Sequence, residues 1–472
     1  MGPRGTRFCA ALCLIVFSGC ARYKPEPLNP LDVQRKLQQA SLNNLAAEFS
    51  SAGRAEPALD IAEGIGPDEA GLAALVLNPA LKVKRLERGI AAGQLVAAGL
   101  YPNPSFDNKS LLGSQRPTGR KSIEGSFSME VLRWQEQFAN VQIKKANIEA
   151  VQYDILNEEW NTVGNARAAW WNAAAAQEKL RLNRDELDLS ERLLESTRAR
   201  IKHGAGTALD ANLSNLQHLK LQLDRQKLEA DADTAKRALR QAIGVSFDAE
   251  MKLRIPEKPF ARHSNAWKLP DLIASLPESA RMKSVEWRYQ ASEGELRAAI
   301  ARQYPSLRLG PSGTFDFDGH WSSLLGFVAT ADVPLINRNQ GEIKEKKAAR
   351  EAAFMDYEAK LQAVQASVAD AAMQVERIEQ RLEFQEKELL PKSTESIQLT
   401  EKAYKAGDVA GSELLIARSL VIDAERSYLD LLIERRTALE SLESVLGRRL
   451  EDISSLHRGA PLESKPAAEA NR

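Results

Sequence analysis

The sequence has too few cysteines, histidines and net charges for several function classes. Its 472 residues include 3 Cys and 5 His, which are scattered and cannot build a four-ligand zinc site or an iron–sulfur cluster. The 64 Lys and Arg balance 64 Asp and Glu, so no basic excess favours nucleic acid as a partner. No nucleophile and base, phosphate loop or carboxylate pair stands out. We therefore expect no enzyme, metal site, cofactor or nucleic-acid partner.

Aromatic residues and glycine are also scarce, which is typical of long helices. Aromatics make up 6% of the chain and charged residues 27%. After Cys20 no run of 18 apolar residues occurs, so the sequence predicts no transmembrane helix.

The first twenty residues resemble a bacterial export signal. Arg4 and Arg7 precede a short apolar run from Phe8 to Phe17. The run ends in Phe17-Ser-Gly-Cys20, which resembles a lipobox, although Phe17 stands where an aliphatic residue is usual. This pattern predicts a signal peptide over 1–19, a lipid attached to Cys20, and, because Ala21 follows, sorting to the outer membrane. The alternative is an ordinary signal peptide with an incidental cysteine.

The remainder is an internal repeat with a period of about 203 residues. Tyr101-Pro102 recurs as Tyr304-Pro305, and two glycines, Gly204 and Gly244, recur as Gly407 and Gly447. The sequence therefore predicts a lipid-anchored N-terminal segment (20–66), a first repeat (67–250), a linker (251–276), a second repeat (277–450) and a disordered tail (451–472).

Each repeat reads as the same series of elements. A helix (67–99 or 277–302) ends at Tyr-Pro, because proline stops helix propagation. A β-hairpin follows (about 103–131 or 305–333), then a long helical hairpin (135–244 or 340–447). Leucines seven residues apart, such as Leu180, Leu187 and Leu194, predict an antiparallel coiled coil in the hairpin.

The predicted strands alternate apolar and polar residues, so each has one apolar face. Four such strands cannot close a membrane barrel, and open edges cannot face lipid. A chain that enters the membrane must therefore pool its strands with copies of itself. The residues predicted to face lipid are Ile123, Phe127, Met129, Leu309, Phe315, Phe317, Leu325 and Phe327.

Three motifs then carry a family resemblance. The segments 23–30 (YKPEPLNP) and 98–104 (AGLYPNP), and Tyr404-Lys-Ala-Gly-Asp408 followed by Glu413-Leu-Leu, resemble the TolC-like outer-membrane efflux family, and most of all its heavy-metal, CzcC-like branch. The resemblance implies a mainly α fold with a small membrane β part. Three copies would form a twelve-stranded β-barrel in the outer membrane, continued by a long periplasmic α-helical barrel.

The resemblance also implies partners and cargo. A periplasmic adaptor and an inner-membrane pump of the RND type would deliver substrate, such as heavy-metal cations or drugs, to a passive duct. The helical hairpin turns would contact the adaptor, through Gly204, Gly206, Thr207, Gly407, Asp408 and Val409.

Acidic residues near these turns have two interpretations. In a trimer, Asp210, Asp408 and Glu413 would form rings that constrict the tunnel and repel anions or attract cations. Alternatively, Asp210 is a helix-start carboxylate favoured by the helix dipole.

Two other protein classes remain open at this stage. A lipid-anchored periplasmic adaptor also has a long helical hairpin, but normally only one. A structural coiled-coil protein of the envelope would have no pore.

Overall fold

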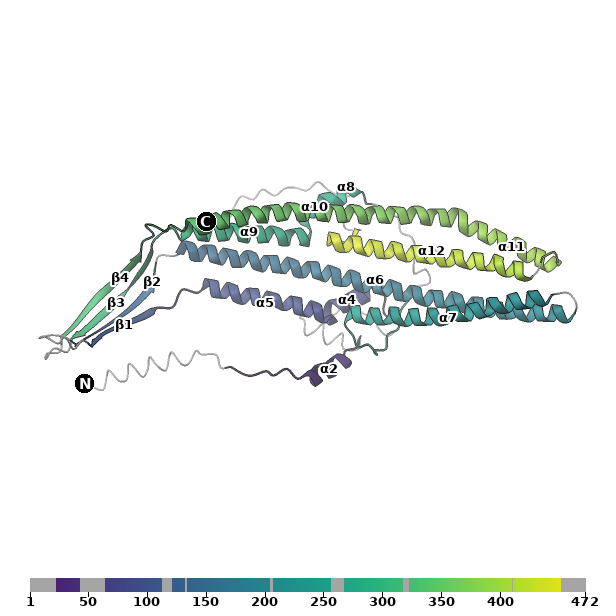
Figure 1. The fold of residues 1–472 in the computed structure, drawn as a ribbon, viewed down its shortest axis with the longest axis horizontal. Coiled ribbons are helices and arrows are strands. Elements are labelled where there is room, and N and C mark those ends of the chain that lie inside the picture. Colours follow the sequence, from purple (N-terminus) through teal and green to yellow (C-terminus); the bar gives the residue numbers. More distant parts are fainter. Residues whose placement is uncertain are drawn as a thin grey trace.

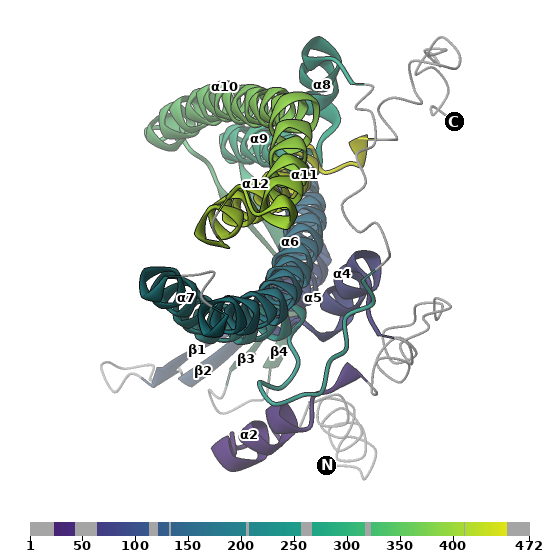
Figure 2. The ribbon, with the colours of Figure 1, turned by 90° about the vertical axis from the view of Figure 1, so that its right-hand side faces the viewer.

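The protein is long and narrow, with a sheet at one end and helical turns at the other (Figure 1). The structure is a computed structural model that describes residues 23–42, 64–112, 121–131, 134–203, 207–255, 267–316, 322–409 and 411–450. A short helix, α2 (Pro30–Gln38), precedes the first repeat. Seen end-on, the longer helices form an open arc with α10 at one end and α7 at the other (Figure 2).

The helix predicted over 67–99 is two helices, α4 (Pro67–Leu77) and α5 (Pro79–Gly99). The break falls at Asn78, whose side-chain oxygen accepts hydrogen bonds from the backbone N–H groups of Ala80 and Leu81 at 2.9 and 3.2 Å. Asn78 therefore starts a new helix, and Pro79 fits its first turn because that position needs no N–H donor. The sequence pattern missed this break because the apolar spacing continues across it.

The two long helices differ in regularity. In the first repeat α6 (Trp134–Lys202) runs unbroken for 69 residues, or about 100 Å. Its counterpart comprises α10 (Gln340–Phe384), a π-helical turn (Gln385–Leu389) and α11 (Leu390–Ala406), where the sequence predicted one continuous helix. Pro391 accounts for the wider turn, because proline lacks the N–H and crowds the carbonyl four residues before it.

The returning helices are α7 (Ala208–Ile243) and α12 (Gly411–Leu446). Both end at the recurring glycines at which the helical hairpins were predicted to end, Gly244 and Gly447, which have positive φ angles of 90° and 63°. This left-handed conformation favours glycine. At Gly244 a Cβ would also lie 2.8 Å from the Cα of Asn78, so the end of α7 packs tightly against the α4–α5 junction.

The second repeat begins with α8 (Leu269–Ser275) and a 3-10 turn (Leu276–Glu278), and continues with α9 (Ala280–Ala301). Four strands form one antiparallel sheet in the order β1 (Ser105–Leu112), β2 (Lys121–Glu130), β3 (Ser306–Asp316) and β4 (Ser322–Asp332). Both predicted β-hairpins are therefore present, and the central pair joins the two repeats.

The main hydrophobic core lies at mid-length, where α4, α6, α7, α10 and α12 meet. Trp170 is fully buried there, and its indole N–H donates to the Ile65 carbonyl at 2.7 Å. The Trp171 ring lies edge-on to it, with ring centroids 4.8 Å apart. The tryptophan pair therefore forms a packing cluster in the core.

Candidate functional site: the hairpin tips, the sheet and the helix faces

Both helical hairpin turns lie at the end of the molecule opposite the sheet (Figure 1). Tyr404 of the second hairpin contacts α6 of the first. Its hydroxyl lies 3.5 Å from Ser196 Oγ, and the Arg200 guanidinium lies 5.0 Å from its ring centroid. The two tips therefore form one surface, held by a hydrogen bond and a cation–π contact.

The first tip contains a complete capping box. The Thr207 hydroxyl oxygen accepts from the Asp210 backbone N–H at 3.2 Å, and Asp210 Oδ2 accepts from the backbone N–H of Thr207 at 3.1 Å. The Thr207 hydroxyl also donates to this carboxylate, and these bonds lower the pKa of Asp210. The helix-start interpretation of Asp210 is confirmed, and the charge stays at the tip.

The second tip turns at Gly407, which has a φ of 88°. The Asp408 backbone N–H donates to the Ala403 carbonyl at 2.9 Å and closes the turn. Asp408 and Glu413 are exposed and Val409 is half-buried. Gly204 and Gly206 lie outside the described residues.

The strand register places the predicted lipid-facing residues on one face of the sheet. Directly paired residues share a face, and Met129 pairs with Leu309 as Ile123 pairs with Phe315. Along β4, Leu325 and Phe327 pair with the same-face positions Gly313 and Pro311. Phe127 is on this face too, and the exposed fractions of Leu325 and Phe327 are 86% and 68%. Phe317 lies outside the described residues.

The opposite face of the sheet is mainly polar. It carries Ser126, Glu130, Arg308, Ser312 and Thr330 on the three strands β2, β3 and β4. The sheet thus has one apolar and one polar face, both without a covering helix in Figure 1.

Three further observations bear on the predicted sites. Cys20 lies outside the described residues. Within the described chain, no helix is both long and apolar enough to cross a bilayer. Over the same residues, no group of three or more His, Cys, Asp or Glu side chains is placed to hold a metal ion.

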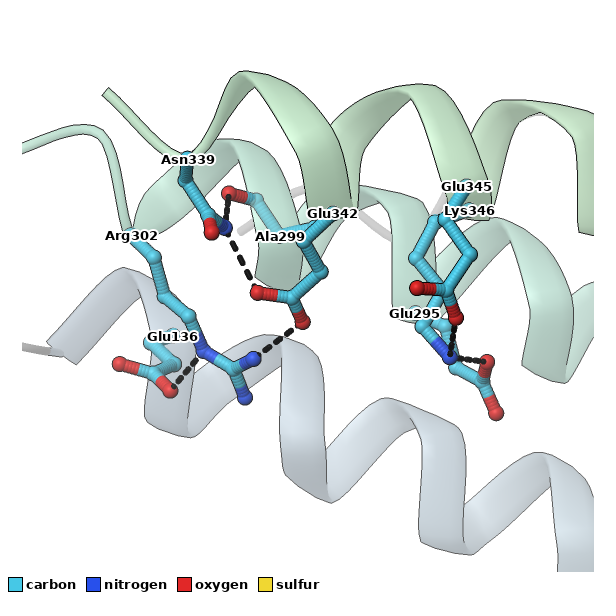
Figure 3. Close-up of polar contacts among 8 residues, drawn as sticks. All are labelled: Glu136, Glu295, Ala299, Arg302, Asn339, Glu342, Glu345 and Lys346. Atoms are coloured by element: carbon cyan, nitrogen blue, oxygen red, sulfur yellow. Dashed lines mark hydrogen bonds and ion pairs between the residues drawn. The ribbon is translucent and has the colours of Figure 1, made fainter. Parts of the chain in front are cut away.

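The structure reveals a helix contact that the sequence did not indicate. Arg302, at the end of α9, donates to Glu136 of α6 at 2.7 Å and also bonds Glu342 of α10 (Figure 3). In this way α9 is held between the long helices of both repeats.

Equivalent contacts link each short helix to the long helix of its own repeat. Gln137 of α6 donates to the Gly99 carbonyl at 3.3 Å, as Asn339 donates to the Ala299 carbonyl at 2.9 Å. Lys144 bonds Gln94 of α5, as Lys346 bonds Glu295 of α9 (Figure 3). These pairs align α5 with α9, and α6 with α10, within one to three residues of the repeat period.

The second face of α9 packs on α6. Ala291 and Ala298 are buried against Ala139, Ile143 and Ala146, with Trp287 beside them. A Cβ at Gly294 would lie 2.6 Å from the side chain of Ile143, so the two helices are in close contact there.

The equivalent face of α5 has no partner in the described chain. When Gln94 is aligned with Glu295, the buried set on α9 corresponds to an exposed set on α5. Leu86 and Ile90 are 71% and 64% exposed, and nothing lies within 4 Å of a Cβ built at Gly93. The corresponding pairs are Leu86 with Trp287, Ile90 with Ala291, Gly93 with Gly294 and Ala97 with Ala298. We call Leu86, Ile90, Gly93 and Ala97 the α5 face.

A matching surface is exposed on α10. When Lys346 is aligned with Lys144, Ala139, Ile143 and Ala146 correspond to Gly341, Glu345 and Ala348. All three are exposed, and a Cβ at Gly341 would meet nothing within 4 Å. We call these three residues the α10 face. The sequence signal for the α5 face is the recurrence of Gly93 and Ala97 as Gly294 and Ala298, which a uniform period of 203 residues obscured.

Comparisons with known proteins agree with this architecture. A family model described as "Outer membrane efflux protein" matches the chain twice, at residues 72–245 and 274–448. CzcC, the cobalt-zinc-cadmium resistance protein of Cupriavidus metallidurans, is 21% identical over 368 residues, covering 75% of this chain and 84% of CzcC. OpmQ, the pyoverdine export outer membrane protein of Pseudomonas aeruginosa, is 24% identical over 337 residues, covering 68% of this chain and 69% of OpmQ.

Among solved structures, CusC superposes with a TM-score of 0.68 at 18% identity, covering 81% of this chain and 92% of CusC. The structures of CusC concern the conformational changes that accompany its folding and the formation of its transmembrane channel. The predicted tandem-repeat fold is confirmed, and the family match decides against the adaptor and against a structural coiled coil. The chain belongs to the outer membrane efflux protein family, and its function is efflux at the outer membrane.

Proposed function

We propose that three copies of this chain close into a ring, which forms a passive duct from the periplasm through the outer membrane. The observation that carries the proposal is the α5 face, which lacks a partner although its equivalent on α9 is buried on α6. Exposed apolar faces of this kind mark interaction surfaces.

The α10 face of a neighbouring copy supplies the missing partner. It corresponds to the α6 surface that α9 covers, so the contact between copies repeats the contact within one copy. Such an interface is head-to-tail, and head-to-tail contacts close into rings when the rotation per copy permits. The open arc of helices in Figure 2 is a segment suited to such a ring. Three is the number that the TolC-like resemblance implies.

The edges of the sheet also require strands from neighbouring copies. β1 and β4 each have one edge without a strand partner in the described chain. Unpaired backbone groups cannot face lipid. Pairing β1 with β4 of the next copy removes both edges and gives a twelve-stranded barrel, with the apolar face toward lipid and the polar face toward water.

The remaining parts of the proposal concern anchor, partners and cargo. Cys20 carries the lipid anchor in the outer membrane. The two tips, with Thr207, Gly407, Asp408 and Val409 described and Gly204 and Gly206 beyond the described residues, contact a periplasmic adaptor joined to an RND-type inner-membrane pump. The curated relatives are named for unlike cargo, metal resistance for CzcC and pyoverdine export for OpmQ. We therefore assign cargo selection to the pump.

A disulfide cross-link between copies tests the ring. Ile143 contacts Gly294 inside the chain, and the equivalent pair between copies is Glu345 and Gly93. The double variant Gly93→Cys with Glu345→Cys, oxidised in the membrane, is expected to give cross-linked dimers and trimers on non-reducing gels, and no larger species.

The single variants are matched controls. In a head-to-tail ring, Gly93 never meets Gly93 of another copy, so neither single variant should form trimers. Absence of cross-linking in the double variant, or a ladder that extends past three copies, contradicts the closed trimer.

A further inference from the structure

The loop that joins β4 to α10, residues 333–339, exposes three large apolar side chains. Val333, Leu335 and Ile336 are 55%, 73% and 92% exposed. The equivalent link in the first repeat, between β2 and α6, covers only residues 131–133. The second repeat therefore has a longer connection here, and a contiguous apolar surface of this kind marks a contact with a partner or a membrane. We call residues 333–339 the β4–α10 loop.

Hydrogen bonds fix the backbone of this loop. The Arg338 backbone N–H donates to Gln340 Oε1 at 2.9 Å, and the Asn339 backbone N–H donates to Asn337 Oδ1 at 3.0 Å. Asn339 has a φ of 60°, in the left-handed region that asparagine enters more readily than most residues. The apolar side chains are thus presented on a defined backbone.

The Asn339 side chain attaches the loop to the end of α9. Its amide group donates to the Ala299 carbonyl at 2.9 Å and to Glu342 Oε2 at 2.8 Å (Figure 3). Glu342 also accepts from Arg302, which donates to Glu136 as well. An ionic cluster therefore begins where the apolar loop ends.

The β4–α10 loop continues the apolar face of the sheet. Along β4 every second residue from Leu325 to Ala331 lies on that face, and Val333 follows in the same alternation. An apolar band about 25 Å tall, crossed by strands tilted by about 40°, takes about ten residues of each strand. Counted from Leu325, such a band ends close to Leu335.

Side chains suited to lipid headgroups lie at the same edge of the sheet. Ser306 pairs with Asp332, so the chain segments that carry Tyr304 and the β4–α10 loop adjoin the sheet at the same end. Tyr304 is 63% exposed, and tyrosine is enriched where membranes meet water. Arg338 is exposed and has no ion-pair partner among the described residues, so its guanidinium is available to bind a phosphate.

We propose that the β4–α10 loop anchors the protein in the periplasmic leaflet of the outer membrane. Leu335 and Ile336 enter the acyl region, and Arg338 binds the phosphates of phospholipid headgroups. The proposal rests on the proposed contact of the apolar sheet face with lipid. The anchor limits how deeply the barrel inserts, because the ionic cluster around Arg302 cannot follow the loop into hydrocarbon.

Phospholipid fits this loop better than a second copy does. The loop extends the sheet face assigned to lipid, whereas the α10 face assigned to the next copy begins after the loop, at Gly341. The unpaired cation of Arg338 also matches an anionic phosphate.

Spin labels measure the depth of the loop in the full-length protein, reconstituted in vesicles of phosphatidylethanolamine and phosphatidylglycerol. A nitroxide on Ile336→Cys is compared with nitroxides on Ala329→Cys, on the apolar sheet face, and on Lys347→Cys, exposed on α10. Oxygen concentrates in lipid and a nickel chelate stays in water, and each changes the power saturation of an accessible label. The unsubstituted chain, treated with the same label, shows any signal from Cys20.

We expect the ratio of oxygen to nickel accessibility at Ile336 to lie between the high ratio at Ala329 and the low ratio at Lys347. A ratio equal to that at Lys347 would place the loop in water. Protection from both reagents would place it beneath protein, such as a second copy. Either result overturns the anchor while the duct stands. A low ratio at Ala329 contradicts the lipid contact of the sheet, and both proposals then fail.

Asn339→Ala tests whether the attachment to α9 positions the anchor. Alanine removes the bond to Ala299 and disfavours a φ of 60°. The Ile336 label should gain mobility, and its accessibility ratio should fall toward that at Lys347. Lys344→Ala, which changes an exposed side chain of α10, is the control and should leave the ratio unchanged. An unchanged ratio in Asn339→Ala would contradict the fixed loop as the cause of the anchoring.

Discussion

Gly310 lies where β3 meets β2, and no side chain fits at this position. A Cβ there would overlap the Phe127 carbonyl oxygen and lie 2.8 Å from the Ser128 Cα. The neighbouring Pro311 has no N–H to donate to the ladder. The two strands from different repeats therefore approach closely at one glycine.

Gly310→Ala is expected to disrupt the β2–β3 pairing, because the obstructing atoms are backbone and cannot rotate away. Overpacking of this kind costs about 1–3 kcal/mol. The measurement is the amount of outer-membrane protein that migrates as a trimer on detergent gels when the sample is not heated. Gly326→Ala is the control, since its Cβ would meet only the Ser312 hydroxyl at 3.0 Å, and it should assemble normally.

At the residue scale, prediction from the sequence succeeded where the role of an amino acid depends only on its neighbours in the chain. Gly244 and Gly447 end helices as predicted, and Asp210 lies in the first turn of α7, where it completes the capping box with Thr207. It failed for Asn78, which caps the start of α5. The apolar spacing continues across Asn78 and Pro79, so the sequence pattern predicted one helix there.

At the scale of elements, the sheet is the part whose two faces differ in polarity. Alternation along the sequence predicted which residues share a face, and the register places the described ones together. Which face meets lipid is part of the proposed function.

A double substitution of Phe127→Asp and Phe327→Asp tests that assignment. Carboxylates on a lipid-facing surface cost up to about 2 kcal/mol each, depending on depth. We expect little protein in the outer membrane, with helical content unchanged by circular dichroism.

Ser126→Asp with Thr330→Asp is the matched control, because these residues occupy the polar face. It should insert normally. Normal insertion of the double Phe variant would show that the apolar face does not contact lipid.

At the scale of the whole molecule, the repeats are joined by a buried ionic junction. Arg167 of α6 bonds Asp68 of α4 and lies 3.5 and 3.7 Å from Glu440 and Glu443 of α12. Burial raises the pKa of Glu440 to about 7, and the nearby Arg167 opposes this shift.

Arg167→Met should therefore destabilise the protein in a pH-dependent way. Removing one partner of a buried ion pair costs about 3 kcal/mol or more. Because the folded-state pKa of Glu440 exceeds its unfolded value, ionisation opposes folding, and the loss of Arg167 raises this pKa further. The loss of thermal stability, followed by circular dichroism, should be larger at pH 8 than at pH 5.

Arg181→Met provides the comparison. Arg181 pairs with Glu178 and Asp185 on the surface of α6, where ion pairs contribute less than about 1 kcal/mol. An equal loss of stability in both variants, or a loss in Arg167→Met that does not vary with pH, would contradict the buried-junction argument.

The sequence by itself determined the repeat, the order of helices and strands, the faces of the strands and the family. These features follow from local signals, because proline, glycine and alternation act on neighbouring residues. Only the tertiary structure decided that Leu86 and Ile90 are left without a partner, that Tyr404 joins the tips, and that Glu186 meets Arg426. Such contacts depend on the rotational phase of each helix. Each residue of displacement between the repeats turns a helix face by about 100°.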